Sequence, residues 1–443
     1  MKPVVVIGGG FAGLAAGVEL AARGIPDTVL EARARLGGRA YSFRDADTGE
    51  TVDNGQHAMM GCYRETLAFL DRIGAGDKVV RQENLRVEMI DAERGAGVIA
   101  AASLPSPLHM LGGVLGYRLL GRAERLRALL GGIRLMAMRQ RRDPRLTEQT
   151  VEQVLMALGQ SKNARVSFWY PVAIATLNET PERAAAAPFA EVLARAFFSS
   201  RAGSQFVLPR VGLSDLYTDD ARRFIEAHGG RIELKATVAS IELQDERVRA
   251  VQLRDRRRLE TAAVISTVPP QALRQCAPQP LRALPDLDQF ELSPIVSVHL
   301  WFDRAILASD FVGFLGTTTQ FVFNRSKLTA QGNGNGRQFV SAVISAGREV
   351  AEWETSRIAA RVVADIRALV PAARNAQVLR SVVVKEKHAT ISTTPAAERL
   401  RPSPHTSIPN FVLAGDWTQT GLPATIESAV LSGRRAADLA ATE

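Results

Sequence analysis

Residues 4–31 read VVVIGGGFAGLAAGVELAARGIPDTVLE, and this stretch decides the fold. An apolar run that ends in three glycines predicts a buried parallel strand over 4–7. Apolar residues at helical spacing predict a helix over 11–24, which ends at Gly24. A second strand is expected over 28–31. The stretch is therefore a βαβ unit, and we expect its crossover to be right-handed.

The glycines of this unit favour a nucleotide site over a purely structural turn. Gly8 permits the tight turn, Gly10 lets the backbone approach a pyrophosphate, and Gly13 lets the helix lie close to the sheet. Ala12 lies at the helix N-terminus, where free N–H groups favour phosphate charge. Glu31 ends the second strand, where its carboxylate can accept from both ribose hydroxyls.

The segment that follows indicates which nucleotide binds. Residues 31–39 read EARARLGGR and resemble the second glycine–arginine motif of the glutathione-reductase-type flavoproteins, in particular their amine oxidase and carotenoid desaturase branch. The resemblance implies FAD, with its adenosine ribose held by Glu31. The positions that would lie along the rest of the cofactor are Ala32, Arg33, Gly38 and Arg39.

A second flavin signature stands near the other end of the chain. Residues 413–429 read LAGDWTQTGLPATIESA and resemble the terminal flavin motif of the same branch. By this resemblance Asp416 binds the ribityl and phosphate edge. Ile426 would begin a helix whose dipole stabilises negative charge on the reduced flavin. The remaining cofactor positions that the resemblance implies are Gly415, Ala424, Thr425 and, at the adenine, Val238.

Two further segments narrow the resemblance. Residues 52–57 read VDNGQH and residues 385–390 read KEKHAT. Together with the terminal motif they resemble the squalene-associated FAD-dependent desaturases, the group of the hydroxysqualene dehydroxylases. This implies reduction of hydroxysqualene to squalene in squalene and hopanoid biosynthesis, with the allylic hydroxyl leaving as water. One departure is His388, where the family pattern more often has arginine.

One side chain is a candidate for the chemistry itself. By the resemblance Gln56 and His57 would lie at the flavin, and His57 is the candidate proton donor to the leaving oxygen. A structural histidine bonded within its own loop remains the alternative. Trp417 is expected to line the substrate pocket, because an aromatic wall suits a polyisoprenoid, although a plain core role is also open.

Two other flavin chemistries compete with this hypothesis. A carotenoid or apocarotenoid desaturase would use oxidised flavin to remove hydride from a polyene precursor. An amine oxidase would use oxygen, but the amine oxidases carry a lysine near flavin N5, and the corresponding strand over 294–303 has none. The single dinucleotide fingerprint is taken by FAD, so the external reductant would be NADPH bound transiently or a separate reductase.

The length of 443 residues predicts more than one domain. We expect an α/β fold with a discontinuous, Rossmann-like FAD-binding domain of the glutathione-reductase type, assembled from residues 1–85, 205–275 and 385–443. A second, α+β substrate domain is expected from residues 86–204 and 276–384. The glycine-rich run 332–336 is interpreted as a surface loop, since no strand or helix pattern flanks it.

The net charge of +9 is concentrated in one segment. Nine arginines lie between residues 118 and 145, opposed only by Glu124 and Asp143, which leaves +7 there. Leucines at helical spacing accompany them, so residues 104–142 are predicted to form an amphipathic segment that faces an anionic membrane surface. Nucleic acid is not expected, because no binding module accompanies the basic segment.

The cysteines and the hydropathy bear on metal sites, membrane spans and location. Cys62 and Cys276 have neither disulfide nor metal spacing, so no metal site is expected and a cytoplasmic setting is favoured. No apolar run approaches the ~18 residues of a membrane span. We therefore expect a protein that is peripheral on the cytoplasmic membrane face. The oligomeric state is not determined by the sequence.

Overall fold

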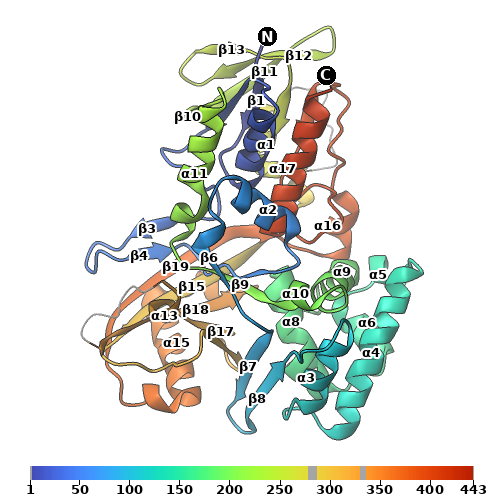
Figure 1. Ribbon diagram of the computed structural model, residues 1–443, viewed down its shortest axis with the longest axis vertical. Helices are drawn as coiled ribbons and strands as arrows, with labels where there is room; N and C mark the ends of the chain where they lie inside the picture. The colour runs from blue at the N-terminus through green and yellow to red at the C-terminus, as the bar shows by residue number, and fades with distance from the viewer. Residues whose placement is uncertain (1, 278–286, 330–335, 443) are drawn as a thin grey trace.

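A computed structural model describes residues 2–277, 287–329 and 336–442. Most of the glycine-rich run 332–336 thus lies outside the described residues. The molecule is elongated, with both termini at one end and a sheet and a helical lobe at the other (Figure 1). No helix in the described ranges is long and apolar enough to cross a membrane.

The end of the molecule that carries the termini is built on a parallel sheet. Its five strands lie in the order β10 (Arg231–Leu234), β2 (Asp27–Glu31), β1 (Val4–Ile7), β14 (Val264–Ser266) and β20 (Phe411–Leu413). The strands predicted over 4–7 and 28–31 are confirmed. Segments from three distant parts of the chain thus meet in one sheet.

Both faces of this sheet are covered by other elements. Since successive side chains of a strand point to opposite sides, each strand contributes to two cores. Val4 and Val6 pack in one core with the helices α1 (Phe11–Ala22), α11 (Leu213–Ala227) and α17 (Ile426–Ala440). Val5 and Ile7 pack on the other side, beneath an antiparallel sheet. The strands of that sheet are β11 (Val238–Gln244), β12 (Arg247–Leu253) and β13 (Arg258–Glu260).

The opposite end of the molecule holds a seven-stranded mixed sheet, which we call the sheet lobe. Its order is β19 (Val378–Ile391), β15 (Leu292–Phe302), β18 (Gln338–Ser345), β17 (Phe321–Asn324), β16 (Phe311–Leu315), β7 (Arg86–Asp91) and β8 (Gly95–Ala100). The helix α15 (Thr355–Leu369) packs against it. The predicted domain boundary at residue 385 falls inside β19, because the pairing with β15 continues from Val378 to Ile391.

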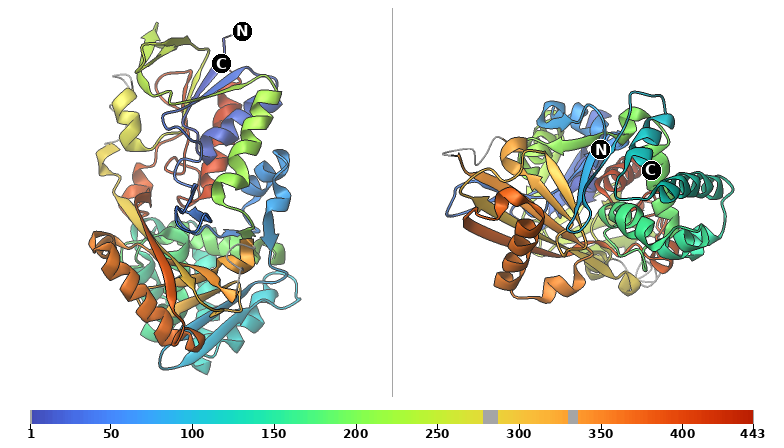
Figure 2. Two further views of the ribbon diagram at one scale, coloured as in Figure 1. Left: turned by 90° about the vertical axis from the view of Figure 1, so that its left-hand side faces the viewer. Right: turned by 90° about the horizontal axis from the view of Figure 1, so that it is seen from below.

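The helices between residues 111 and 204 form a second lobe, the helical lobe. They are α3 (Leu111–Gly116), α4 (Arg122–Gln140), α5 (Arg145–Glu148), α6 (Val151–Ala157), α7 (Lys162–Ala164), α8 (Tyr170–Leu177), α9 (Ala186–Phe197) and α10 (Arg201–Ser204). Seen from below, the helical lobe lies beside the sheet lobe (Figure 2). The two lobes share the end of the molecule away from the termini.

Short elements connect these parts. Two small sheets pair β3 (Ser42–Arg44) with β4 (Thr51–Asp53), and β9 (Phe206–Pro209) with both β5 (Met59–Met60) and β6 (Val79–Arg81). The short helices are α2 (Arg64–Arg72), α12 (Pro270–Cys276), α13 (Arg325–Thr329), α14 (Arg348–Glu352) and α16 (Pro395–Leu400).

Asp27 is a charged residue buried without a partner at the start of β2. Its side chain is 2% exposed, and neither carboxylate oxygen has a hydrogen-bond partner. The carboxylate lies against Gly17 and Gly230, where no donor is offered. Burial therefore raises the pKa of Asp27 to about 7 from an ordinary value near 3.8.

This raised pKa predicts a pH-dependent stability. The unfolded chain ionises Asp27 at lower pH than the folded one, so its contribution is fully present below about pH 3.8 and is lost as the pH rises to about 7. Asp27→Asn should therefore be more stable than the wild type above pH 7, by up to about 4 kcal/mol. Urea unfolding between pH 4 and 8 measures this, and a constant difference across that range would contradict it.

Candidate active site

The turn between β1 and α1 has the geometry that its glycines predicted. Gly8 has φ = +110°, a conformation that favours glycine. A Cβ atom on Gly13 would stand 1.8 Å from the Gly8 carbonyl oxygen, so the helix rests directly on the turn. A Cβ on Gly10 would meet only Gly38, at 3.6 Å from its Cα. The free backbone of Gly10 and Gly38 thus leaves a cradle open to a ligand.

Glu31 ties this turn to the second glycine–arginine motif. Its Oε2 accepts from the Gly9 N–H at 2.8 Å and its Oε1 from the Arg33 N–H at 2.8 Å. Each carboxylate oxygen retains acceptor capacity for a ribose hydroxyl. Glu31 therefore braces both loops, a role that the sequence did not indicate.

An ion pair joins the two ends of the chain at the same place. Arg39 Nη2 donates to Asp416 Oδ1 at 2.5 Å, and Arg39 Nη1 donates to the Ala389 carbonyl at 3.1 Å. Asp416 follows β20, and Thr425 begins α17 by accepting from the Ser428 N–H. The three motifs that are far apart in the sequence are thus contiguous in space.

A single large cavity of about 970 Å³ connects these motifs. Every predicted cofactor residue except Gly13, which lies behind the turn, contributes to its wall. They are Gly8, Gly10, Ala12, Glu31, Ala32, Arg33, Gly38, Arg39, Gln56, His57, Val238, Gly415, Asp416, Ala424, Thr425 and Ile426. The exposed side chain of His388 does not line it.

Trp417 lies outside this cavity. Its side chain is 1% exposed, its ring packs edge-on against Phe290, and its indole N–H donates to the Val268 carbonyl at 3.1 Å. The expectation that Trp417 lines the substrate pocket is therefore wrong. Because it follows the glycine turn at 415, its side chain points back into the core beneath the parallel sheet.

A buried ion pair holds the turn that carries Gln56 and His57. Arg325 in α13 lies 2.9 Å from Asp53 Oδ2, and both side chains are 2% exposed. Nη2 of Arg325 is the atom near Asp53, and its Nη1 donates to Gln56 Oε1 at 3.0 Å. The sequence did not single out Arg325, although an arginine directly after the apolar strand FVFN is an available signal.

The bonding of His57 argues against its predicted role as proton donor. Its Nδ1 is 2.8 Å from the Gly55 carbonyl oxygen, which can only accept. Burial lowers the pKa of His57, and the nearby Arg325 guanidinium lowers it further. A neutral His57 thus uses its one proton within its own loop, which is the alternative that the sequence left open.

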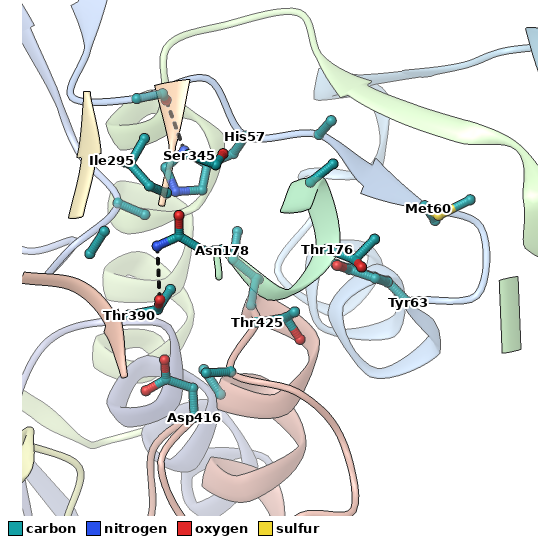
Figure 3. Close-up of a pocket in the computed structure, with 18 of the residues that line it drawn as sticks. His57, Met60, Tyr63, Thr176, Asn178, Ile295, Ser345, Thr390, Asp416 and Thr425 are labelled. Atoms are coloured by element: carbon teal, nitrogen blue, oxygen red, sulfur yellow. Dashed lines mark hydrogen bonds between the residues drawn. The ribbon is translucent and has the colours of Figure 1, made fainter. Parts of the chain in front are cut away.

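Beyond the cradle the cavity is mainly apolar and runs between the two lobes. A few polar side chains stand where it meets the cradle (Figure 3). Asn178 donates to Thr390 Oγ1 at 2.9 Å and accepts from the Ala346 N–H at 2.7 Å. Other hydroxyls of this region belong to Tyr63, Thr176 and Ser345. None of these was identified from the sequence, because each is an isolated polar residue.

The far end of the cavity opens through the helical lobe. Leu108, Leu111, Leu126, Leu130 and Ile133 line the cavity and are also exposed to solvent. They come from the segment before α3, from α3 and from α4, at the end of the molecule away from the termini (Figure 1). An apolar ligand can therefore pass from the outer surface to the cradle without crossing charged groups.

Residues 11–441 match the family of flavin containing amine oxidoreductases. The chain belongs to this family. Its enzyme class is accordingly that of an FAD-dependent oxidoreductase, and the cradle fits that cofactor, since the backbone of Gly10 and Gly38 is open and the Glu31 carboxylate faces it. The sequence-based hypothesis of a flavoenzyme of this superfamily is confirmed.

Individual relatives are similar over their whole length. The chain is 27% identical to a hydroxysqualene dehydroxylase of Sinorhizobium fredii, covering 100% of this chain and 99% of the relative. It is 28% identical to the enzyme of that name from Rhodopseudomonas palustris (99% and 98% covered). A 15-cis-phytoene desaturase of Solanum lycopersicum is 24% identical (97% and 76% covered).

Solved structures show the fold. A putrescine oxidase bound to putrescine superposes with a TM-score of 0.74 at 16% identity, covering 100% of this chain and 99% of that one. The predicted α/β fold with a Rossmann-like FAD-binding part is confirmed by such neighbours.

Mutation of the buried Asp53–Arg325 pair tests its contribution to stability and to FAD binding. Arg325→Met leaves the Asp53 carboxylate buried without its counter-charge, which should cost about 3–5 kcal/mol of unfolding free energy and release FAD. Adding Asp53→Asn should recover part of that loss. Arg304→Met removes an exposed pair with Asp303 and should cost under about 1 kcal/mol. Equal losses in the two single variants, measured by denaturant unfolding, would refute the special role of this pair.

Proposed function

We propose that this flavoenzyme reduces hydroxysqualene to squalene in squalene and hopanoid biosynthesis, with the allylic hydroxyl leaving as water. The observation that carries the proposal is the apolar cavity of about 970 Å³ that leads from the outer surface to the FAD cradle. The full-length relatives that bear the name hydroxysqualene dehydroxylase support it.

The side chains on the cavity wall suit this reaction. Apolar walls accept an isoprenoid chain and exclude water from the reacting carbon. The helix α17 begins at Ile426, which lines the cavity, so the positive end of its dipole lies there and stabilises negative charge. Reduced FAD, when bound, supplies the hydride. The polar side chains near the cradle are the groups available to hold an alcohol.

A carotenoid desaturase is the second candidate. The resemblance to 15-cis-phytoene desaturases covers 97% of the chain, and the same apolar cavity suits a polyene precursor. That reaction runs in the opposite sense, since it takes hydride from the substrate. An external reductant, either NADPH or a separate reductase, is needed only for the dehydroxylase.

An anaerobic single-turnover experiment decides between these two directions. We expect the purified protein to carry FAD, and its chemically reduced form to be reoxidised by hydroxysqualene with formation of one squalene per flavin. The desaturase predicts instead that oxidised flavin is reduced by phytoene. Gas chromatography of the products and the flavin absorbance measure both. Reduced enzyme that leaves hydroxysqualene unchanged would overturn the proposal.

We also propose that the cavity mouth docks on the cytoplasmic face of an anionic membrane. Of the ten large apolar side chains exposed in the described ranges, seven lie within residues 104–133. Seven arginines of the same segment form no ion pair with a described acid, because its basic residues outnumber its acids; they are Arg118, Arg122, Arg125, Arg127, Arg134, Arg141 and Arg142. Two leucines of the predicted amphipathic segment, Leu119 and Leu120, are buried and do not belong to this exposed surface.

Membrane docking predicts selective loss of binding on mutation of this surface. Leu115→Ser combined with Ile133→Ser removes two side chains that are 44% and 59% exposed. Binding to vesicles that contain phosphatidylglycerol should fall roughly tenfold, because buried apolar area is lost. Leu379→Ser, at a site 43% exposed elsewhere, should leave binding unchanged. Cosedimentation measures this, and equal binding of all three proteins would contradict it.

A further inference from the structure

A small second cavity lies directly behind the polar end of the large one. Its volume is about 40 Å³, enough for at least one water molecule. The two cavities share four lining residues, Met60, Tyr63, Thr176 and Thr425, which therefore form the wall between them. We call the small cavity the annex.

Tyr63 is the member of that wall that can carry a proton. It directly precedes α2 and lines both cavities together with Thr425, the residue that caps the N-terminus of α17. Figure 3 shows Tyr63 beside Thr176 on one side of the cavity, with His57 and Ser345 on the other side. The phenol thus stands at the end of the apolar cavity where the FAD cradle begins.

The environment of Tyr63 keeps its hydroxyl protonated. Burial raises the pKa of the phenol, and the neighbouring Cys62 and Glu427 raise it further. A protonated phenol in an apolar wall is a hydrogen-bond donor to an alcohol oxygen.

The annex provides a route for protons from outside. Its far wall includes Glu191 and Arg195, which form an ion pair, and the Arg195 side chain is 45% exposed. The annex wall is otherwise mainly apolar, so a water in it would bond to the Tyr63 hydroxyl on one side and to this ion pair on the other. Glu427, also in the annex wall, is occupied by the N–H groups of Glu65 and Thr66 at the start of α2.

We propose that Tyr63 is the acid that protonates the leaving hydroxyl, and that the annex holds the water that reprotonates Tyr63. This inference rests on the proposed reduction of hydroxysqualene. In the step, the C–O bond breaks, a hydride from the dihydroflavin forms the new C–H bond, and the Tyr63 proton joins the leaving oxygen as water. Anionic reduced flavin, when bound, would supply the two electrons of this hydride, the allylic carbon is reduced, and the tyrosinate takes a proton that annex water relays from solvent.

The geometry favours Tyr63 over His57 as the proton donor. The proton on His57 Nδ1 is directed at the Gly55 carbonyl, and the neighbouring Gln56 is bonded to the buried Arg325. Tyr63 instead has the substrate cavity on one side and the annex on the other. Tyr63 can therefore be reprotonated from the annex, whose wall does not include His57.

The decisive experiment compares leaving groups in Tyr63→Phe. Reoxidation of the reduced holoenzyme by hydroxysqualene should slow by roughly 10²–10⁴-fold, the usual contribution of general acid catalysis. With the formate ester of hydroxysqualene, whose leaving group needs no proton, the variant should stay within about threefold of the wild type. Tyr170→Phe removes a phenol oxygen outside the cavity, which bonds Glu152, and should match the wild type with both substrates.

A binding measurement provides a readout that does not depend on turnover. Oxidised wild-type holoenzyme should bind hydroxysqualene roughly five- to tenfold more tightly than squalene, the value of one hydrogen bond. Tyr63→Phe should abolish this preference. Quenching of tryptophan fluorescence by each ligand measures both affinities.

The outcomes separate this inference from the proposed function. If the wild-type enzyme forms no squalene, the proposed function is wrong, and so is the role assigned to Tyr63. Wild-type activity retained in Tyr63→Phe, or equal slowing with alcohol and ester, overturns only the role of Tyr63. If Tyr63→Phe loses FAD, 3-fluorotyrosine at position 63 preserves the shape. Its more acidic phenol should then speed the alcohol reaction alone, and an unchanged alcohol rate would overturn the inference.

Discussion

The ion pair between Arg39 and Asp416 is the contact on which the site depends, because it joins loops 377 residues apart. Asp416 is nearly buried, so its carboxylate is stable there only with a cation beside it. Arg39 also binds the carbonyl of Ala389, at the end of β19. The parallel sheet, the terminal flavin motif and the sheet lobe are therefore held together at one residue.

A second ion pair, Asp53–Arg325, is fully buried and also joins two parts of the site. It connects a turn after β4 to the short helix α13 of the sheet lobe. A buried pair of this kind adds little net stability, since desolvation opposes the attraction, but losing one partner is costly. Such contacts specify one arrangement of the lobes, and that arrangement leaves the apolar cavity between them open.

The cavity has a polar end and an apolar end because the parallel sheet and the two lobes line different parts of it. Backbone N–H groups, Glu31 and Asp416 surround the cofactor end, whereas leucine, valine and phenylalanine side chains line the other end. Water is excluded from the apolar part, and the few hydroxyls and amides at the junction are therefore the groups that can orient a polar atom of a hydrophobic substrate. The annex behind Tyr63 lies between this junction and the partly exposed Arg195.

The sequence by itself determined the parallel strands at 4–7 and 28–31, the glycine turn and the flavin class, because each depends on local spacing or on a contiguous motif. Gly8 and Gly13 are required by the turn alone, and Glu31 by the end of a strand. Only the tertiary structure decided that Trp417 is buried, that Arg325 holds Gln56, and that Tyr63 separates two cavities. Each of these depends on contacts between residues far apart in the chain, and burial or pairing of that kind leaves no periodic signal in the sequence.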